Sequence, residues 1–102
     1  MYRARDAVEH EKYLDDLETA GNELDLPQET ISTAKDIFLT ASPDQERSKR
    51  AVLAASLYAG ALITGNERSQ QTVATTLDVS RLTIQNRWKE LVQDAGFEPP
   101  TW

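Results

Sequence analysis

The chain has 102 residues, of which 39% are hydrophobic and 27% charged, a balance typical of one folded domain rather than a disordered segment. It contains no cysteine, which excludes disulfides, thiolate metal sites and cysteine nucleophiles. The net charge is −6, and no stretch is suited to span a membrane or act as a secretion signal, so a soluble cytoplasmic protein is expected.

The charges are distributed unevenly along the chain. Residues 1–46 include 12 acidic and 4 basic residues, whereas residues 47–92 include 7 basic and 3 acidic residues. A basic C-terminal half on an acidic body indicates that one face meets a polyanion and that another is kept away from it. Chance clustering on a solvated surface is the alternative.

Helical periodicity predicts two helices in the acidic half. The first covers about 7–20, with Gly21 and Asn22 as its terminators. The second begins at Pro27, because proline suits a first helical turn, where its missing N–H costs nothing. The apolar residues at helical spacing in these two segments are Val8, Tyr13, Leu14, Leu17, Ala20, Ile31, Ala34, Ile37 and Phe38.

A third helix, predicted over about 48–64, is apolar nearly all round. Its sequence RAVLAASLYAGAL is rich in small residues, Ser48 is suited to cap its start, and Gly65 with Asn66 ends it. A helix that is apolar on every side is buried, so we expect a central helix that its neighbours approach closely.

Two shorter helices are predicted over about 70–77 and 81–94, with Ser80 as the N-cap of the second and Gly96 after its end. Core positions are assigned to Val73, Ala74, Leu77, Val79, Ile84, Trp88 and Leu91. The expected fold is therefore an all-α domain of five helices over residues 1–102, with a buried third helix and a helix-turn-helix at 70–94.

The last predicted helix has a polar face that is suited to DNA. That face presents Arg81, Thr83, Gln85, Asn86 and Lys89. Such side chains contact base edges and phosphates, and Arg81 lies in the first turn, the part of a recognition helix that enters the major groove. An ordinary helical hairpin is the alternative; for Trp88, the alternative to core packing is stacking on a base.

Three segments resemble, in register, the second cyclin-like repeat of transcription factor IIB and of its archaeal counterpart, TFB. They are LDLPQETISTAKDIF, RSKRAVLAASLYAGALITGNERSQQTVA and LDVSRLTIQNRWKELV. The resemblance implies the five-helix cyclin-box fold, with a helix-turn-helix that reads promoter DNA upstream of the TATA box. It also implies the TATA-binding protein and RNA polymerase as partners of the complete factor.

Carried over to this sequence, the resemblance names further candidate DNA contacts. Those for base edges and nearby backbone are Ser80, Leu82, Thr83 and Gln85, and those for phosphates are Arg68, Ser69, Arg87 and Lys89. Arg81 and Asn86, from the polar face, complete the predicted set.

The sequence also departs from the family pattern. Gln85 stands where the family commonly has a base-reading arginine, so either the preferred base changes from guanine to adenine or base readout is lost. Lys49 replaces a proline, and Leu77-Asp78 replaces a frequent Ala-Gly, which predicts a less tight turn. The zinc ribbon, the reader-loop segment and the first repeat are missing, so we do not expect a complete initiation factor.

Two functions remain open. One is a small DNA-binding transcription regulator, which needs a homodimer or the TATA-binding protein for useful affinity because one repeat offers one short contact. The other is a protein-interaction module that binds or competes for basal transcription components without reading DNA; Gln85 and the acidic surface favour it. The acidic composition further suggests a salt-loving archaeal source, since at molar salt the Debye length is only about 3 Å and surface acids repel DNA little.

An enzyme is the least favoured class. The only histidine, His10, lies in the acidic segment EHEK, which lacks a convergent set of metal ligands. No glycine-rich phosphate loop follows a strand. No catalytic residue, metal or cofactor is therefore predicted. Arg47, Lys49 and Arg50 are either an additional phosphate patch or ordinary helix-surface charges.

Overall fold

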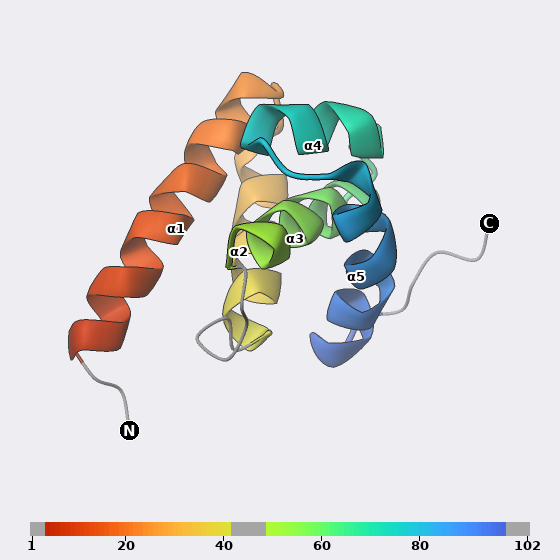
Figure 1. Ribbon diagram of the computed structural model, residues 1–102. Helices are drawn as coiled ribbons and strands as arrows, with labels where there is room; N and C mark the ends of the chain where they lie inside the picture. The colour runs from red at the N-terminus through yellow and green to blue at the C-terminus, as the bar shows by residue number, and fades with distance from the viewer. Residues whose placement is uncertain (1–3, 42–48, 98–102) are drawn as a thin grey trace.

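The computed structural model describes residues 4–41 and 49–97, with side chains from residue 11 onward, and these residues form five α-helices and no strand. In chain order they are α1 (Ala4–Glu23), α2 (Gln28–Thr40), α3 (Lys49–Ile63), α4 (Gln70–Leu77) and α5 (Arg81–Asp94) (Figure 1). The predicted all-α, five-helix fold is confirmed. No helix in the described ranges is long and apolar enough to cross a membrane.

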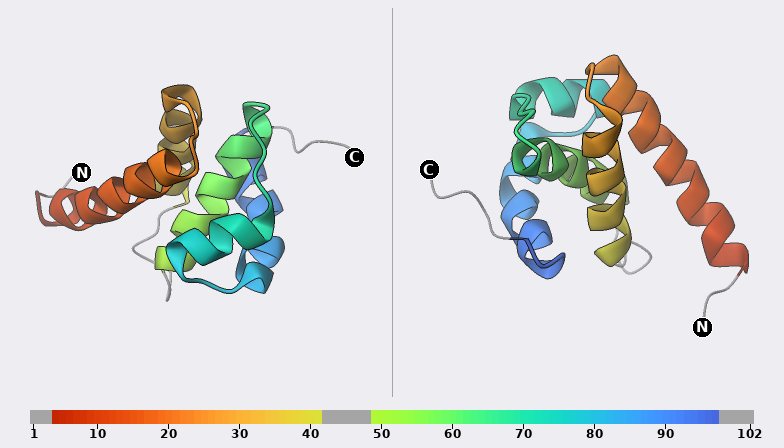
Figure 2. Two further views of the ribbon diagram at one scale, coloured as in Figure 1. Left: turned by 90° about the horizontal axis from the view of Figure 1, so that it is seen from above. Right: turned by 180° about the vertical axis from the view of Figure 1, so that it is seen from behind.

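Helix α3 is the centre of the fold, as its composition predicts. It contacts each of the other four helices, and Figure 2 shows it enclosed among them. Every residue from Val52 to Leu62 is buried. One of them is polar: Ser56 is fully buried, and its hydroxyl has no hydrogen-bond partner.

The small residues of α3 allow α2 to approach it closely. A Cβ atom added at Gly60 would lie 3.0 Å from both the Cβ and the backbone nitrogen of Ala34. Few real Cβ atoms have contacts this short, so a larger residue at position 60 would require α2 to shift by a few tenths of an ångström.

The predicted end of the first helix is wrong. Helix α1 continues through Gly21 and Asn22 to Glu23. A Cβ atom at Gly21 would lie 2.6 Å from Cγ1 of Ile31, so this glycine makes room for α2 instead of ending α1. The end is formed by Asp25, which has a φ of +57°, while the amide of Leu26 donates to the carbonyl of Gly21 at 2.9 Å.

The other helix boundaries lie close to the predicted ones. Pro27 is the N-cap of α2, so this helix begins one residue later than predicted. The bounds of α4 and α5 agree with the prediction, whereas the proposed Ser48 cap lies outside the described residues. Gly65 and Gly96, after α3 and α5, have positive φ as expected of residues that follow a helix end.

Candidate nucleic-acid interface

Helix α4 is an uncharged helix that is fixed at its start by a serine. The hydroxyl oxygen of Ser69 accepts a hydrogen bond from the amide of Thr72 at 3.0 Å, which satisfies one of the free amides of the first turn. Val73, Ala74 and Leu77 are buried as predicted. The outer side presents only neutral polar groups: Gln71, Thr72 and Thr75.

The turn between α4 and α5 is tight despite the absence of glycine. Asp78 has a left-handed backbone, with a φ of +57°, and the amide of Val79 donates to the carbonyl of Ala74 at 2.9 Å. Aspartate is one of the few residues that tolerate this backbone region, so the turn forms without a glycine. Ser80 then caps α5 as predicted, since its hydroxyl accepts from the amide of Leu82 at 3.2 Å.

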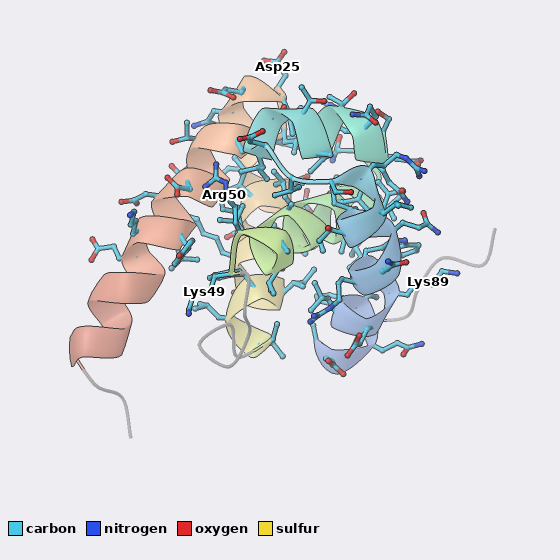
Figure 3. All side chains as sticks on the ribbon, viewed as in Figure 1. Asp25, Lys49, Arg50 and Lys89 are labelled. Carbon is cyan, nitrogen blue, oxygen red and sulfur yellow. The ribbon has the colours of Figure 1, made fainter. Side chains whose placement is uncertain are left out.

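Helix α5 has one buried and one exposed face. Ile84, Trp88, Leu91 and Val92 are buried. The exposed residues of this helix are Arg81, Leu82, Gln85, Asn86, Lys89, Glu90, Gln93 and Asp94, and Thr83 is half-buried beside the first of them. Figure 3 shows Lys89 on the side of α5 that faces away from the other helices. The structure thus brings together most of the residues predicted to contact DNA.

Trp88 belongs to the core, as its spacing predicts. Its side chain is only 8% exposed, and its ring meets that of Tyr58 edge-to-face at a centroid distance of 5.7 Å. The ammonium group of Lys89 lies 5.6 Å from the centre of the Trp88 ring, where it makes a cation–π contact. This environment is that of a core residue rather than of a side chain presented for base stacking.

A shallow hollow lies beside the exposed face of α5. Its volume is about 200 Å³. Its lining combines aromatic, aliphatic, amide and charged side chains, including Tyr58, Leu62, Glu67, Gln70 and Gln85. Sequence reasoning missed Gln70 as a functional candidate. Its amide oxygen accepts a hydrogen bond from Nη1 of Arg81 at 3.3 Å, which joins the first turns of α4 and α5.

The structure places Arg68 apart from the exposed face of α5 and gives it a structural role. Its Nε donates to the carbonyl of Leu24 at 3.0 Å, and its Nη2 donates to that of Asp25 at 3.2 Å. Nη1 donates to the carbonyls of Asn66 and Glu67 at 2.9 and 3.2 Å. The guanidinium therefore joins the α1–α2 turn to the loop before α4, and most of its donors are used within the protein.

Two other arginines are also engaged. Nε of Arg87 lies 3.8 Å from a carboxylate oxygen of Glu90, one turn further along α5, and the side chain is partly buried. Nε of Arg50 donates to the carbonyl of Leu77, at the end of α4, at 2.8 Å. Nη1 of Arg50 also lies 3.6 Å from Asp16 of α1 (Figure 3). Arg50 thus links α3 to α1 and α4, and its side chain is 46% exposed. Arg47 lies outside the described residues.

The α4–α5 hairpin and helix α1 differ in charge. Residues 69–94 include three basic and three acidic residues, so the α4–α5 hairpin is neutral overall. Helix α1, with an acidic sequence, lies on the other side of α3 from α5 in both Figure 1 and Figure 2. Among the described residues no group of three acids or histidines could hold a metal ion, and the side chain of His10 is not among them.

Comparison with known proteins supplies the family. Residues 7–94 match the model of the transcription factor TFIIB repeat. The chain belongs to the TFIIB repeat family. The resemblance seen in the sequence is thereby confirmed, and with it the cyclin-like nature of the five-helix fold.

Archaeal transcription initiation factors are among the relatives of this chain. The chain is 35% identical over 88 residues to transcription initiation factor IIB 4 of Halobacterium salinarum, a match covering 86% of the chain and 25% of the relative. It is 37% identical over 70 residues to transcription initiation factor IIB of Archaeoglobus fulgidus, covering 69% of the chain and 20% of the relative. The chain thus spans about a quarter or less of these relatives. Their names are those of initiation factors rather than enzymes, so the expectation of a non-enzymatic protein is confirmed at the level of the family.

Proposed function

We propose that this chain is a small transcription regulator that binds promoter DNA through the α4–α5 hairpin, used as a helix-turn-helix. The observation that carries the proposal is the exposed face of α5, where Arg81, Gln85 and Asn86 stand on a helix whose other side is packed on α3. A rigid helix with exposed guanidinium and amide groups suits the edges of base pairs in the major groove. Membership of the TFIIB repeat family also supports a role in transcription.

We assign roles within this face by chemistry. Gln85 is exposed, and its amide suits the N6 and N7 atoms of adenine, so an A·T pair is the expected preference at that position. Leu82 and Thr83 are placed near base edges, while Ser69, Ser80 and Lys89 serve the backbone. Arg87 retains part of its exposed surface for a phosphate. Arg68 leaves this set, because its donors bind carbonyls of the protein itself.

The neutral hairpin predicts weak dependence of binding on salt. Only a few basic residues of the hairpin are available to contact phosphates, so few counterions are released when the complex forms. A single hairpin also makes one short contact, which favours binding as a homodimer or beside a partner such as the TATA-binding protein. Weak dependence on salt would suit a source organism with a high internal salt concentration.

A second function is favoured by a different observation. The acidic α1 lies on the other side of α3 from α5, and the hairpin has no net positive charge, as suits a module that binds basic surfaces of transcription components. In that case the acidic residues of α1 and α2 carry the interaction and α5 does not read DNA.

An NMR titration separates the two functions. The labelled protein is titrated with a short duplex that carries a TATA box and its upstream flank, at about 0.1 M and about 1 M potassium chloride. Shifts confined to Ser69–Gln71 and Ser80–Lys89 are expected, with weaker binding in Arg81→Ala and unchanged binding in the control Lys12→Ala, which replaces an exposed basic residue of α1. Absence of shifts at both salt concentrations rejects DNA binding by the chain alone, and the TATA-binding protein is then titrated in place of DNA.

A further inference from the structure

Gln70 is the residue of α4 that touches the proposed reading face of α5. Its amide oxygen accepts from Nη1 of Arg81 at 3.3 Å, although the two residues are 11 positions apart. Gln70 also lines the hollow that Gln85 borders, and Gln85 follows Arg81 by one helical turn on the same face. One half-buried amide thus lies beside both of the side chains that are proposed to read bases.

We propose that Gln70 is a positioning residue, which holds the guanidinium of Arg81 in the orientation that discriminates between base pairs. This inference rests on the proposed DNA-binding function and deepens it. A long arginine side chain loses rotamer freedom when it docks in a groove, so a contact that already orders it in the free protein strengthens specific binding.

The chemistry of the contact suits this role. A carboxylate beside Arg81 would orient the guanidinium but also cancel its charge. The glutamine oxygen accepts one of five N–H donors, so it orients the group and leaves both the charge and the other donors for DNA. Among the described residues, Arg81 has no ion pair, in contrast to Arg50 and Arg87.

The neighbouring glutamine provides a matched control. Gln71 is exposed on the same helix, but its amide donates to Oγ1 of Thr75 at 3.1 Å, within α4. Replacing Gln71 removes a glutamine of equal size from the same turn without touching Arg81. An effect specific to position 70 therefore reports the contact between the helices rather than a change in α4.

The test is a double-mutant cycle of DNA binding, measured by fluorescence anisotropy. The probes are a duplex with a TATA box and its upstream flank, and the same duplex with the flank scrambled. We expect Gln70→Ala to reduce the ratio of the two affinities about three- to tenfold, and to have no further effect in Arg81→Ala. Gln71→Ala keeps the ratio of the unmodified protein.

Two additional variants separate the loss of the hydrogen bond from a loss of packing and from a change in charge. Gln70→Met keeps the packing at the hollow but cannot accept from Arg81, and it should repeat the effect of Gln70→Ala with an unchanged melting temperature. Gln70→Glu keeps the acceptor but neutralises Arg81, so it should weaken binding to both duplexes.

The outcomes distinguish this inference from the function on which it rests. If the unmodified protein binds neither duplex, DNA binding itself fails and the positioning role fails with it. If it binds both duplexes equally, DNA binding stands and the role in discrimination is overturned. If Gln70→Ala lowers the ratio equally with and without Arg81, or does not lower it, only the positioning role is overturned.

Discussion

The inner side of the molecule, where α1 and the α1–α2 turn meet α3, α4 and the loop before α4, differs in its arginine contacts from the outer face of α5. In the first region, Arg50 and Arg68 donate to backbone carbonyls, which they supply with partners that the helix ends and turns lack. On the outer face, Arg81 meets one neutral amide and is otherwise exposed. The comparison teaches that a basic residue indicates a nucleic-acid surface only where its donors are not consumed by the protein.

Helix α5 itself has a structural face and an exposed face, and replacing Trp88 on the structural face has the largest expected effect on stability. Trp88→Ala removes a side chain that is 8% exposed and packed against Tyr58, so we expect the free energy of unfolding to fall by about 3–5 kcal/mol. Denaturant unfolding followed by circular dichroism measures the loss. A variant that keeps its stability but no longer binds DNA would move Trp88 from the core to the interface.

Replacing Arg68 tests whether the inner arginines are structural. In Arg68→Ala, the carbonyls of Leu24 and Asp25 lose a charged donor, and so do those of Asn66 and Glu67. Water can reach part of this site, and we expect a loss of about 1.5–3 kcal/mol in the free energy of unfolding. The matched change Arg81→Ala should cost less than about 0.5 kcal/mol. Equal effects of the two variants on unfolding would remove the distinction between the regions.

The turn that joins the two regions offers a smaller effect of opposite sign. Asp78 has a φ of +57°, which costs a residue with a side chain about 1 kcal/mol relative to glycine. Asp78→Gly should therefore raise the free energy of unfolding by up to about 0.5 kcal/mol, because the greater entropy of glycine in the unfolded chain offsets about 0.5–1 kcal/mol of the gain. Thermal unfolding measures the gain. Asp15→Gly, inside α1, is the control and should lower stability; a loss in Asp78→Gly would show that the aspartate side chain itself supports the turn.

Local signals explain why α4 and α5 could be predicted to the residue. Ser69 and Ser80 accept from amides two or three positions further on, so each cap and its partner lie together in the sequence. The faces of α5 follow from spacing alone, since Ile84, Trp88 and Leu91 repeat at helical intervals. Such features need no knowledge of the rest of the fold.

The features that the sequence could not predict depend on distant residues. Gly21 resembles a helix terminator, and only the position of Ile31 on α2 shows that it is a packing site. The sequence predicts that Arg68 contacts a phosphate, yet its guanidinium donates to the carbonyls of Leu24 and Asp25, which are 44 and 43 residues away. The contact between Gln70 and Arg81 is hidden for the same reason, because it joins two helices across a turn.

The smallest expected change in stability belongs to the outer face, at Leu82. This side chain is 58% exposed, unusual for leucine, and Leu82→Ala should change the free energy of unfolding by less than about 0.5 kcal/mol. Its exposure has a use if α5 enters a major groove, where an apolar side chain can meet the methyl group of thymine. The variant should therefore fold normally and bind the TATA duplex with less preference over the scrambled one in fluorescence anisotropy. A loss of stability near that of Trp88→Ala would instead show that Leu82 is covered in solution and that the outer face of α5 is not open to DNA.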